Sequence, residues 1–294
     1  LAHLIPTPEL AEGREILSDV LLPHADGNDA LAVKQRFRPL PRRFLQAIRD
    51  WPEQESLLKK VLTVLEKHPR LQYQLRQQAT LRTQQRYLLP TKQALLFLGP
   101  AKSREFILLT HFQQHLTAPV FPLRATLLQR RAMLAFSLPA FCSLANIRLP
   151  ISAELISYFL VYDLWFDRRF TTQVTWHAPA SKAVPDAINA WLPWQKSYDH
   201  RHALKLLDYW QMPSEVAGLL TQHDIYNTAQ ACIRLSHCAS ILICDYGGAI
   251  PKAWHSQLEH LISILGIKPR DFRMALVQLA ERHHIFSPYQ KIPL

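Results

Sequence analysis

The run at residues 159–167 reads FLVYDLWFD and places one carboxylate, Asp163, among large apolar side chains. Desolvating a lone ionised aspartate in such surroundings costs free energy, so this carboxylate must be paired, bound to a metal or turned to water. Imidazoles are the other groups that could do chemistry, because the chain contains 14 histidines. Candidate ligand-binding histidines follow the run in the sequence: His200, His202, His223 and His237.

Metal binding and a structural role are both open for these histidines. His200 and His202 are two residues apart, so their side chains diverge on a helix, although they could converge in a loop. His223 stands in the sequence TQHD, where a surface or core histidine is the simpler interpretation. From spacing alone we predict no metal site.

The remaining reactive side chains show no arrangement typical of a catalytic or cofactor site. The cysteines lack the CxxC spacing of zinc sites, and we expect all of them to be reduced and buried: Cys142, Cys232, Cys238 and Cys244. No nucleophile elbow, ordered triad, P-loop or dinucleotide-binding fingerprint is present in the sequence. The sequence therefore predicts no cofactor.

A formal net charge of +11 raises the hypothesis of nucleic-acid binding, because clustered Lys and Arg attract phosphates. The basic residues, however, come in short groups, without a continuous stripe along one helix and without a zinc-finger or base-stacking signature. A solvated or partner-facing basic surface is the simpler interpretation. We do not expect this protein to bind nucleic acid.

The composition favours a helical protein. The lack of a visible signal peptide or membrane span leads us to expect it in the cytoplasm. The chain is 48% hydrophobic and has only 7 Gly against 21 Pro, while Leu, Ala, Gln, Lys and Arg fill the segments between the prolines. No signal peptide is visible, and no stretch of about 20 apolar residues is free of charge, so we expect no membrane span.

Apolar residues recur at helical spacing along most of the chain. Residues 1–38 look like an N-terminal appendage, and residues 39–118 are predicted to form a first helical half that is broken at Gly99-Pro100. Residues 119–288 are predicted to form a second half, interrupted by a connection at residues 171–196 that is rich in Pro and Trp. The sequence therefore predicts an all-α array of roughly a dozen helices.

One segment of the second half, LLDYWQMPSEV, also predicts core residues. Its large apolar side chains cover one helix face, so we expect these four to be buried: Leu206, Leu207, Trp210 and Val216. Pro213 is expected to begin a new helix after a turn at Gln211-Met212.

Three segments, in this order, resemble the HDOD domains, which are bacterial signalling modules related to HD-type metal phosphohydrolases. HPRLQYQLRQQAT is similar to the family's DP-x-L…LLR-x-AN pattern, LPTKQALLFLG to its I-x-S-x-x-x-A-I-x-x-LG element, and LLDYWQMPSEV to its LL-x-x-W-x-LP-x-x-I element. The matching positions are His68, Pro69, Leu71, Leu75, Arg76, Ala79, Ala94, Leu98, Gly99, Leu206, Leu207, Trp210 and Pro213. The resemblance covers about residues 39–285 and implies an N-terminal helical half packed on an HD-like half.

The resemblance also implies where the metal site of the HD enzymes would fall, and the sequence departs from that site. Those enzymes use a first His, a His-Asp pair in an LLHDIG run and a later Asp to hold a metal that activates water. Here the run is LVYDLW, so Asp163 keeps the aspartate position while Tyr162 replaces the histidine. The first His falls on Arg131 and the last Asp on His237.

Arginine has no lone pair for a metal, so the cation at this position points to a degenerate metal site. We expect Arg131, or Arg130 as the fallback, to pair with Asp163 in place of the metal. The alternative is that Asp163 binds only water or backbone amides.

This comparison leads to an expected function and one alternative. We expect a catalytically inactive, HDOD-like regulatory binding module of bacterial signal transduction, whose partner is a signalling protein. The alternative is a metal-dependent phosphohydrolase with a rearranged HD site built from Asp163, His223 and His237. The residues do not identify the partner, a ligand or the oligomeric state.

Overall fold

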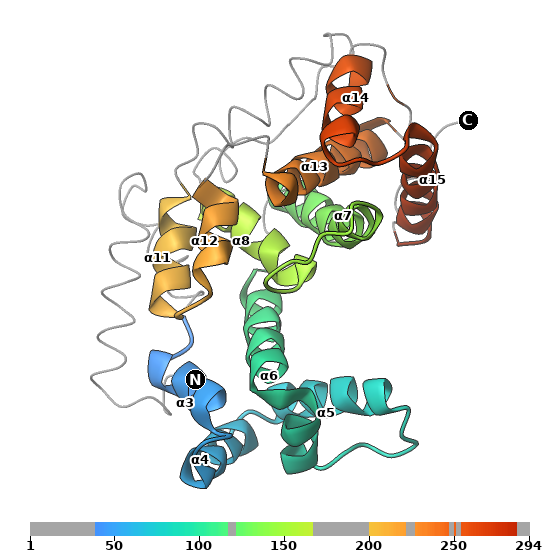
Figure 1. Cartoon of the computed structure of the whole chain (residues 1–294). Helices are drawn as coiled ribbons and strands as arrows, with labels where there is room; N and C mark the ends of the chain where they lie inside the picture. Colours follow the sequence, from blue (N-terminus) through green and yellow to red (C-terminus); the bar gives the residue numbers. More distant parts are fainter. Residues whose placement is uncertain are drawn as a thin grey trace. The chain divides into compact units, whose positions relative to one another are not determined.

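The computed structural model describes residues 39–116, 122–166, 200–221, 227–246, 250 and 254–286. In this part of the chain the regular structure consists of eleven α-helices, without a strand (Figure 1). No helix among these residues is both long enough and apolar enough to cross a membrane. The all-α prediction is confirmed, while the appendage at residues 1–38 and the connection at residues 171–196 lie outside the described residues.

The helices belong to two compact units, with the boundary between Ala118 and Pro119. The first unit holds α3 (Arg42–Asp50), α4 (Glu55–Glu66), α5 (Pro69–Thr83) and α6 (Thr91–His115). The second unit holds α7 (Pro122–Leu144), α8 (Ala153–Phe166), α12 (Ser214–Thr221), α13 (Thr228–Tyr246), α14 (His255–Ile264) and α15 (Pro269–Phe286). Helix α11 (Arg201–Tyr209) begins in the second unit, but its end and the following turn, Asp208–Gln211, belong to the first. From the sequence, this short segment was expected to belong to the second half.

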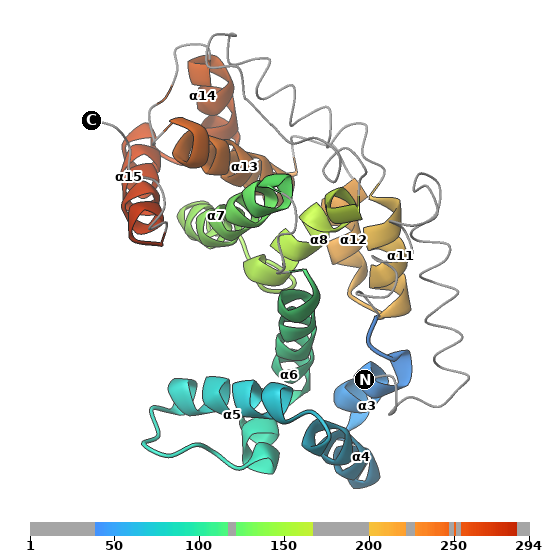
Figure 2. The same ribbon diagram turned by 180° about the vertical axis from the view of Figure 1, so that it is seen from behind.

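The first unit is built around α6, which packs against α3 and α5 (Figure 2). Its core consists of fully buried aliphatic side chains from all four helices: Leu45, Ile48, Val61, Leu65, Leu75, Ala94, Leu95 and Ile107. Helix α5 begins with Pro69 in its first turn and is capped at its end by Gln84, whose φ of 53° is left-handed. Proline suits a first turn and a left-handed residue commonly closes a helix, so both ends follow from local sequence.

A sharp kink interrupts α6 at Gly99, where the sequence predicts a break. Gly99 has φ 72° and ψ 170°, a conformation that residues with a Cβ rarely adopt, and Pro100 follows it directly. Proline cannot donate a backbone hydrogen bond and so cannot continue the preceding helix. The break at Gly99-Pro100 is therefore confirmed.

The second unit is built around α7, which packs against α8, α13 and α15 (Figure 1 and Figure 2). Phe141 of α7 stacks on Phe272 of α15, with 5.6 Å between the ring centroids. Three of the four cysteines are buried and reduced as expected, whereas Cys244, in the last turn of α13, is only half-buried.

The turn between α11 and α12 confirms the predicted core residues. Leu206, Leu207, Trp210 and Val216 are all at most 2% exposed, and α12 begins directly after Pro213. Gln211 has a left-handed φ of 49°, and its N–H donates to the carbonyl of Asp208 while the Met212 N–H donates to that of Leu207. This pair of bonds is the Schellman arrangement that closes a helix.

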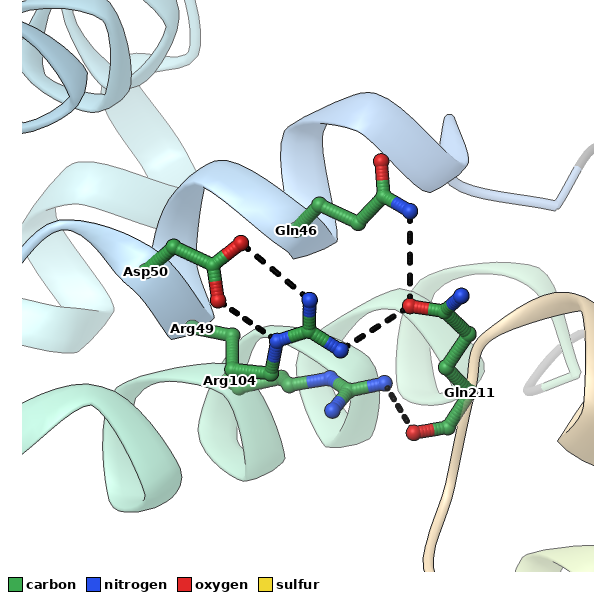
Figure 3. A network of polar contacts seen from close by, with 5 residues as sticks. All are labelled: Gln46, Arg49, Asp50, Arg104 and Gln211. Carbon is green, nitrogen blue, oxygen red and sulfur yellow. Dashed lines mark hydrogen bonds and ion pairs between the residues drawn. The ribbon is translucent and has the colours of Figure 1, made fainter.

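Polar side chains of the first unit contact Gln211 in this same turn (Figure 3). Arg104 of α6 donates to the backbone carbonyl of Gln211 at 3.0 Å. The Gln211 side-chain oxygen accepts from Arg49 at 3.0 Å and from Gln46 at 3.3 Å, and Arg49 also pairs with Asp50 at 2.6 Å. Since the Arg49–Asp50 pair is largely exposed, it adds little stability by itself.

Candidate functional site

Asp163 lies near the end of α8, and its carboxylate closes the amino end of α11. One carboxylate oxygen accepts the backbone N–H of His202 at 3.1 Å, and the other accepts the N–H of Ala203 at 3.0 Å. The first of these oxygens also lies 2.8 Å from Nδ1 of His202. Asp163 itself is 4% exposed, so these contacts replace the water that a buried carboxylate loses.

The contact has the chemistry of a helix cap supplied from another helix. His202 and Ala203 are the second and third residues of α11, and their N–H groups are the ones that a capping oxygen usually satisfies. The residue at the cap position is His200, with φ 22°. A negative charge at the amino end of a helix is also favoured by the helix dipole. Of the alternatives considered for Asp163, the structure shows the one in which it binds backbone amides. The imidazole of His202 lies beside the same carboxylate.

The expected pair between Arg131 and Asp163 is wrong. Arg131 of α7 donates to the hydroxyl of Ser157 at 3.3 Å, and its guanidinium carbon lies 4.1 Å from the centroid of the Tyr158 ring. Both partners lie on α8, where Ser157 precedes Asp163 by six residues, or roughly 9 Å along a helix. The guanidinium is therefore held by Ser157 and Tyr158, about one and a half turns before the aspartate.

The neighbouring arginine, Arg130, points in a different direction and is buried. It is 4% exposed, and its charge acts on His237 of α13. Burial, with smaller contributions from the charges of His200 and Arg130, lowers the pKa of His237 to about 3. His237 is therefore neutral at physiological pH. An ion pair between Arg130 and Asp163 stays a prediction.

We call these five residues the polar cluster: Arg130, Asp163, His200, His202 and His237. Three of the predicted site residues, Asp163, His200 and His202, meet at the amino end of α11, and His237 joins them through its interaction with His200. Tyr162 is fully buried beside Asp163, and burial together with the aspartate charge raises the pKa of its phenol well above the usual range. Tyr162 is thus a neutral core residue, and His223 lies outside the described residues.

The cluster contains few free ligands for a cation. Both oxygens of Asp163 accept backbone hydrogen bonds, and a buried guanidinium lies close enough to affect His237. Within the described ranges, no three His, Cys, Asp or Glu side chains are grouped so that they could hold a metal. The arrangement can stabilise the buried carboxylate of Asp163 and hold the start of α11 against it.

The sequence left backbone amides open as partners of Asp163, but it did not indicate that they belong to the start of α11. The two N–H groups lie 39 and 40 residues further along the chain, and backbone groups leave no mark in residue types. A signal for this contact was present at the cap position of α11. His200 stands there, and histidine is not among the residue types that usually cap a helix, so an acceptor from elsewhere in the chain was needed.

The chain was also compared with known proteins. No family model, no curated protein and no solved structure matches it.

Proposed function

We propose that this protein is a catalytically inactive, HDOD-like regulatory module that binds a partner in bacterial signal transduction. The single observation that carries the proposal is the engagement of Asp163. Asp163 stands at the position of a metal-binding aspartate of the HD enzymes that the sequence resembles. Here both of its carboxylate oxygens accept backbone N–H groups of α11. A carboxylate held this way contributes to stability and is poorly placed to coordinate a cation.

Two further features support a module without hydrolytic chemistry. The arginine next to the expected first ligand position, Arg130, brings a permanent positive charge toward His237, and a guanidinium repels a divalent cation. Tyr162, at the position of the second ligand, is buried with a raised pKa and so offers no anionic oxygen. Arg130 thus places a positive charge near His237, at the position of the last expected ligand.

The test is a comparison of metal content and stability between the wild type and Asp163→Asn. Protein purified without chelator is analysed for iron, manganese and zinc, and its melting temperature is recorded with and without added Mn²⁺. A ligand that binds only the folded state raises the melting temperature. We expect no stoichiometric metal and no shift with Mn²⁺ in either protein.

The alternative function is a metal-dependent phosphohydrolase that uses Asp163, His237 and His223 in a rearranged site. It predicts stoichiometric metal and turnover of a generic phosphodiester that is lost in Asp163→Ala. That result would reject the regulatory module. If no turnover is found, affinity capture from a bacterial lysate with mass spectrometry is the next step toward the signalling partner.

A further inference from the structure

The first unit contains a cavity of about 610 Å³, remote in sequence from the polar cluster. It lies among α3, α4, the start of α5 and the second part of α6. Cavities of about 300–1,000 Å³ are typical of sites for small molecules. Its volume therefore fits a ligand of that size.

The wall of the cavity is apolar. The large apolar residues that line it number six, and three of these, Leu40, Val61 and Ile107, are at most 5% exposed. The other three are Phe44, Val64 and Leu71. An apolar body placed here would gain the free energy of leaving water, about 25 cal/mol for each Å² that it buries.

The polar part of the lining carries one sign of charge. It includes the exposed cations Arg43, Lys60, Lys67 and Arg70, and none of the described residues that line the cavity is an Asp or a Glu. Lys60, Val64 and Lys67 follow at spacings of four and three residues, so they share one face of α4 and its end. Cations of this kind attract an anion and contribute more when an apolar wall excludes water beside them.

Trp210, in the segment Asp208–Gln211 that belongs to the first unit, contacts two residues that line the cavity. Trp210 donates from Nε1 to the carbonyl of Leu40 at 3.1 Å, and its ring meets that of His111 edge-on at 6.3 Å between centroids. Leu40 and His111 both line the cavity, and Trp210 is 1% exposed. Leu40 and His111 are therefore held in place by contacts with the buried core, and we expect the cavity to exist before a ligand binds.

We propose that this cavity binds a small organic anion with an apolar body, such as a medium-chain alkyl carboxylate or alkyl phosphate. The apolar part would lie against Val61, Val64 and Ile107, and the anionic head would lie among Lys60, Lys67 and Arg70. This site is separate from the polar cluster. Failure of this proposal would leave the proposed regulatory function unchanged, and the reverse also holds.

The test uses calorimetric titration of the full chain with four probes that are present as monomers. Decanoate and decyl phosphate carry the proposed head groups, decyltrimethylammonium carries the opposite charge on the same chain length, and acetate lacks the apolar body. We expect decanoate or decyl phosphate to bind with one site per chain and at least tenfold more tightly than the cation or acetate. The stronger of the two anions identifies the head group. Equal affinity for the cation, or no saturable binding of either anion, would overturn the proposal.

Two variants then locate the bound anion. Lys60→Glu combined with Lys67→Glu reverses two rim charges and is expected to weaken binding about tenfold or more. Ala47→Phe, at a half-buried residue of α3 that lines the cavity, is expected to block it. The matched control is Lys59→Glu, an exposed lysine beside Lys60 that does not line the cavity.

Circular dichroism verifies that each variant is folded. Anion binding that persists in both cavity variants, or that falls equally in Lys59→Glu, would place the site elsewhere and reject the proposal. If one cavity variant does not fold, the other still decides the question, because each acts on a different part of the site.

Discussion

The two ends of α11 are held by different kinds of contact. At the amino end, one buried carboxylate, Asp163, accepts two backbone N–H groups and lies beside an imidazole. At the carboxyl end, Arg104 donates to the Gln211 carbonyl and exposed side chains add further bonds (Figure 3). The ring of Trp210, at the same end, is buried. Negative charge at the start of a helix and positive charge at its end both complement the helix dipole. We therefore expect the stability of the amino end to depend mainly on one buried charge and that of the carboxyl end mainly on apolar burial.

The largest effect is expected at the carboxyl end, from Trp210→Ala. Removing a buried tryptophan should lower the free energy of unfolding by about 4 kcal/mol, because it leaves a cavity and an unsatisfied Leu40 carbonyl. The ring contact with Phe112, at 5.5 Å between centroids, is lost as well. Urea denaturation followed by circular dichroism measures the change.

Trp210→Phe serves as the control for this variant. It keeps most of the aromatic volume and loses the Nε1 hydrogen bond, so a smaller loss is expected. If Trp210→Ala cost less than about 1 kcal/mol, apolar burial would not be what anchors this end of α11.

The second effect concerns the amino end, where Asp163→Ala removes the cap. We expect a loss of about 3 kcal/mol in the free energy of unfolding, since two buried N–H groups lose their acceptor. Asp163→Asn should recover only part of it, because an amide offers one acceptor oxygen where the carboxylate has two. Thermal and urea denaturation give both values.

Asp208→Ala is the matched control, since Asp208 is exposed on the same helix. It should change the stability by less than about 0.5 kcal/mol. An equal loss in Asp208→Ala and Asp163→Ala would mean that the amino end is not held by the capping carboxylate.

The third effect is a dependence on pH at the amino end. The pKa of His237 is about 3 in the folded protein and 6.5 when the group is unperturbed, so the unfolded chain binds the proton more readily. Stability is therefore full above about pH 6.5 and declines as the pH falls toward 3. Between pH 7 and pH 5 the loss from this residue should be about 2 kcal/mol.

Urea denaturation at a series of pH values measures this slope, and His237→Gln should flatten it. His260→Gln, at an exposed histidine of α14, is the control and should leave the slope unchanged. An unchanged slope in His237→Gln would contradict the assignment of acid sensitivity to the polar cluster.

The smallest effect is expected from the exposed contacts at the carboxyl end. Arg49→Ala breaks the pair with Asp50 and the bond to Gln211, yet it should cost less than about 1 kcal/mol, because both side chains are solvated. Arg104→Ala should cost more, since Arg104 is more buried and bonds to a backbone carbonyl at a helix end. Melting curves at low and high salt compare the two variants, and a larger loss in Arg49→Ala would reverse this ranking.

Local signals in the sequence were enough for most of the fold. The helices follow from apolar spacing, the break in α6 from Gly99-Pro100, and the burial of Trp210 from the segment that carries it. Each of these depends on residues close together in the chain, where steric limits and helical periodicity act directly. The assignment of Asp208–Gln211 to the first unit was not foreseen, because long-range packing decides it.

The sequence by itself determined that Asp163 needs a partner, since an ionised carboxylate cannot be buried alone. It did not determine which partner. Arg131 was expected from its position in the resembling motif, but its guanidinium lies over the ring of Tyr158, about one and a half helical turns before the aspartate. Only the tertiary structure decided the outcome, because it brings the start of α11 to a carboxylate 39 residues away, and the backbone N–H groups that bind it exist in every sequence.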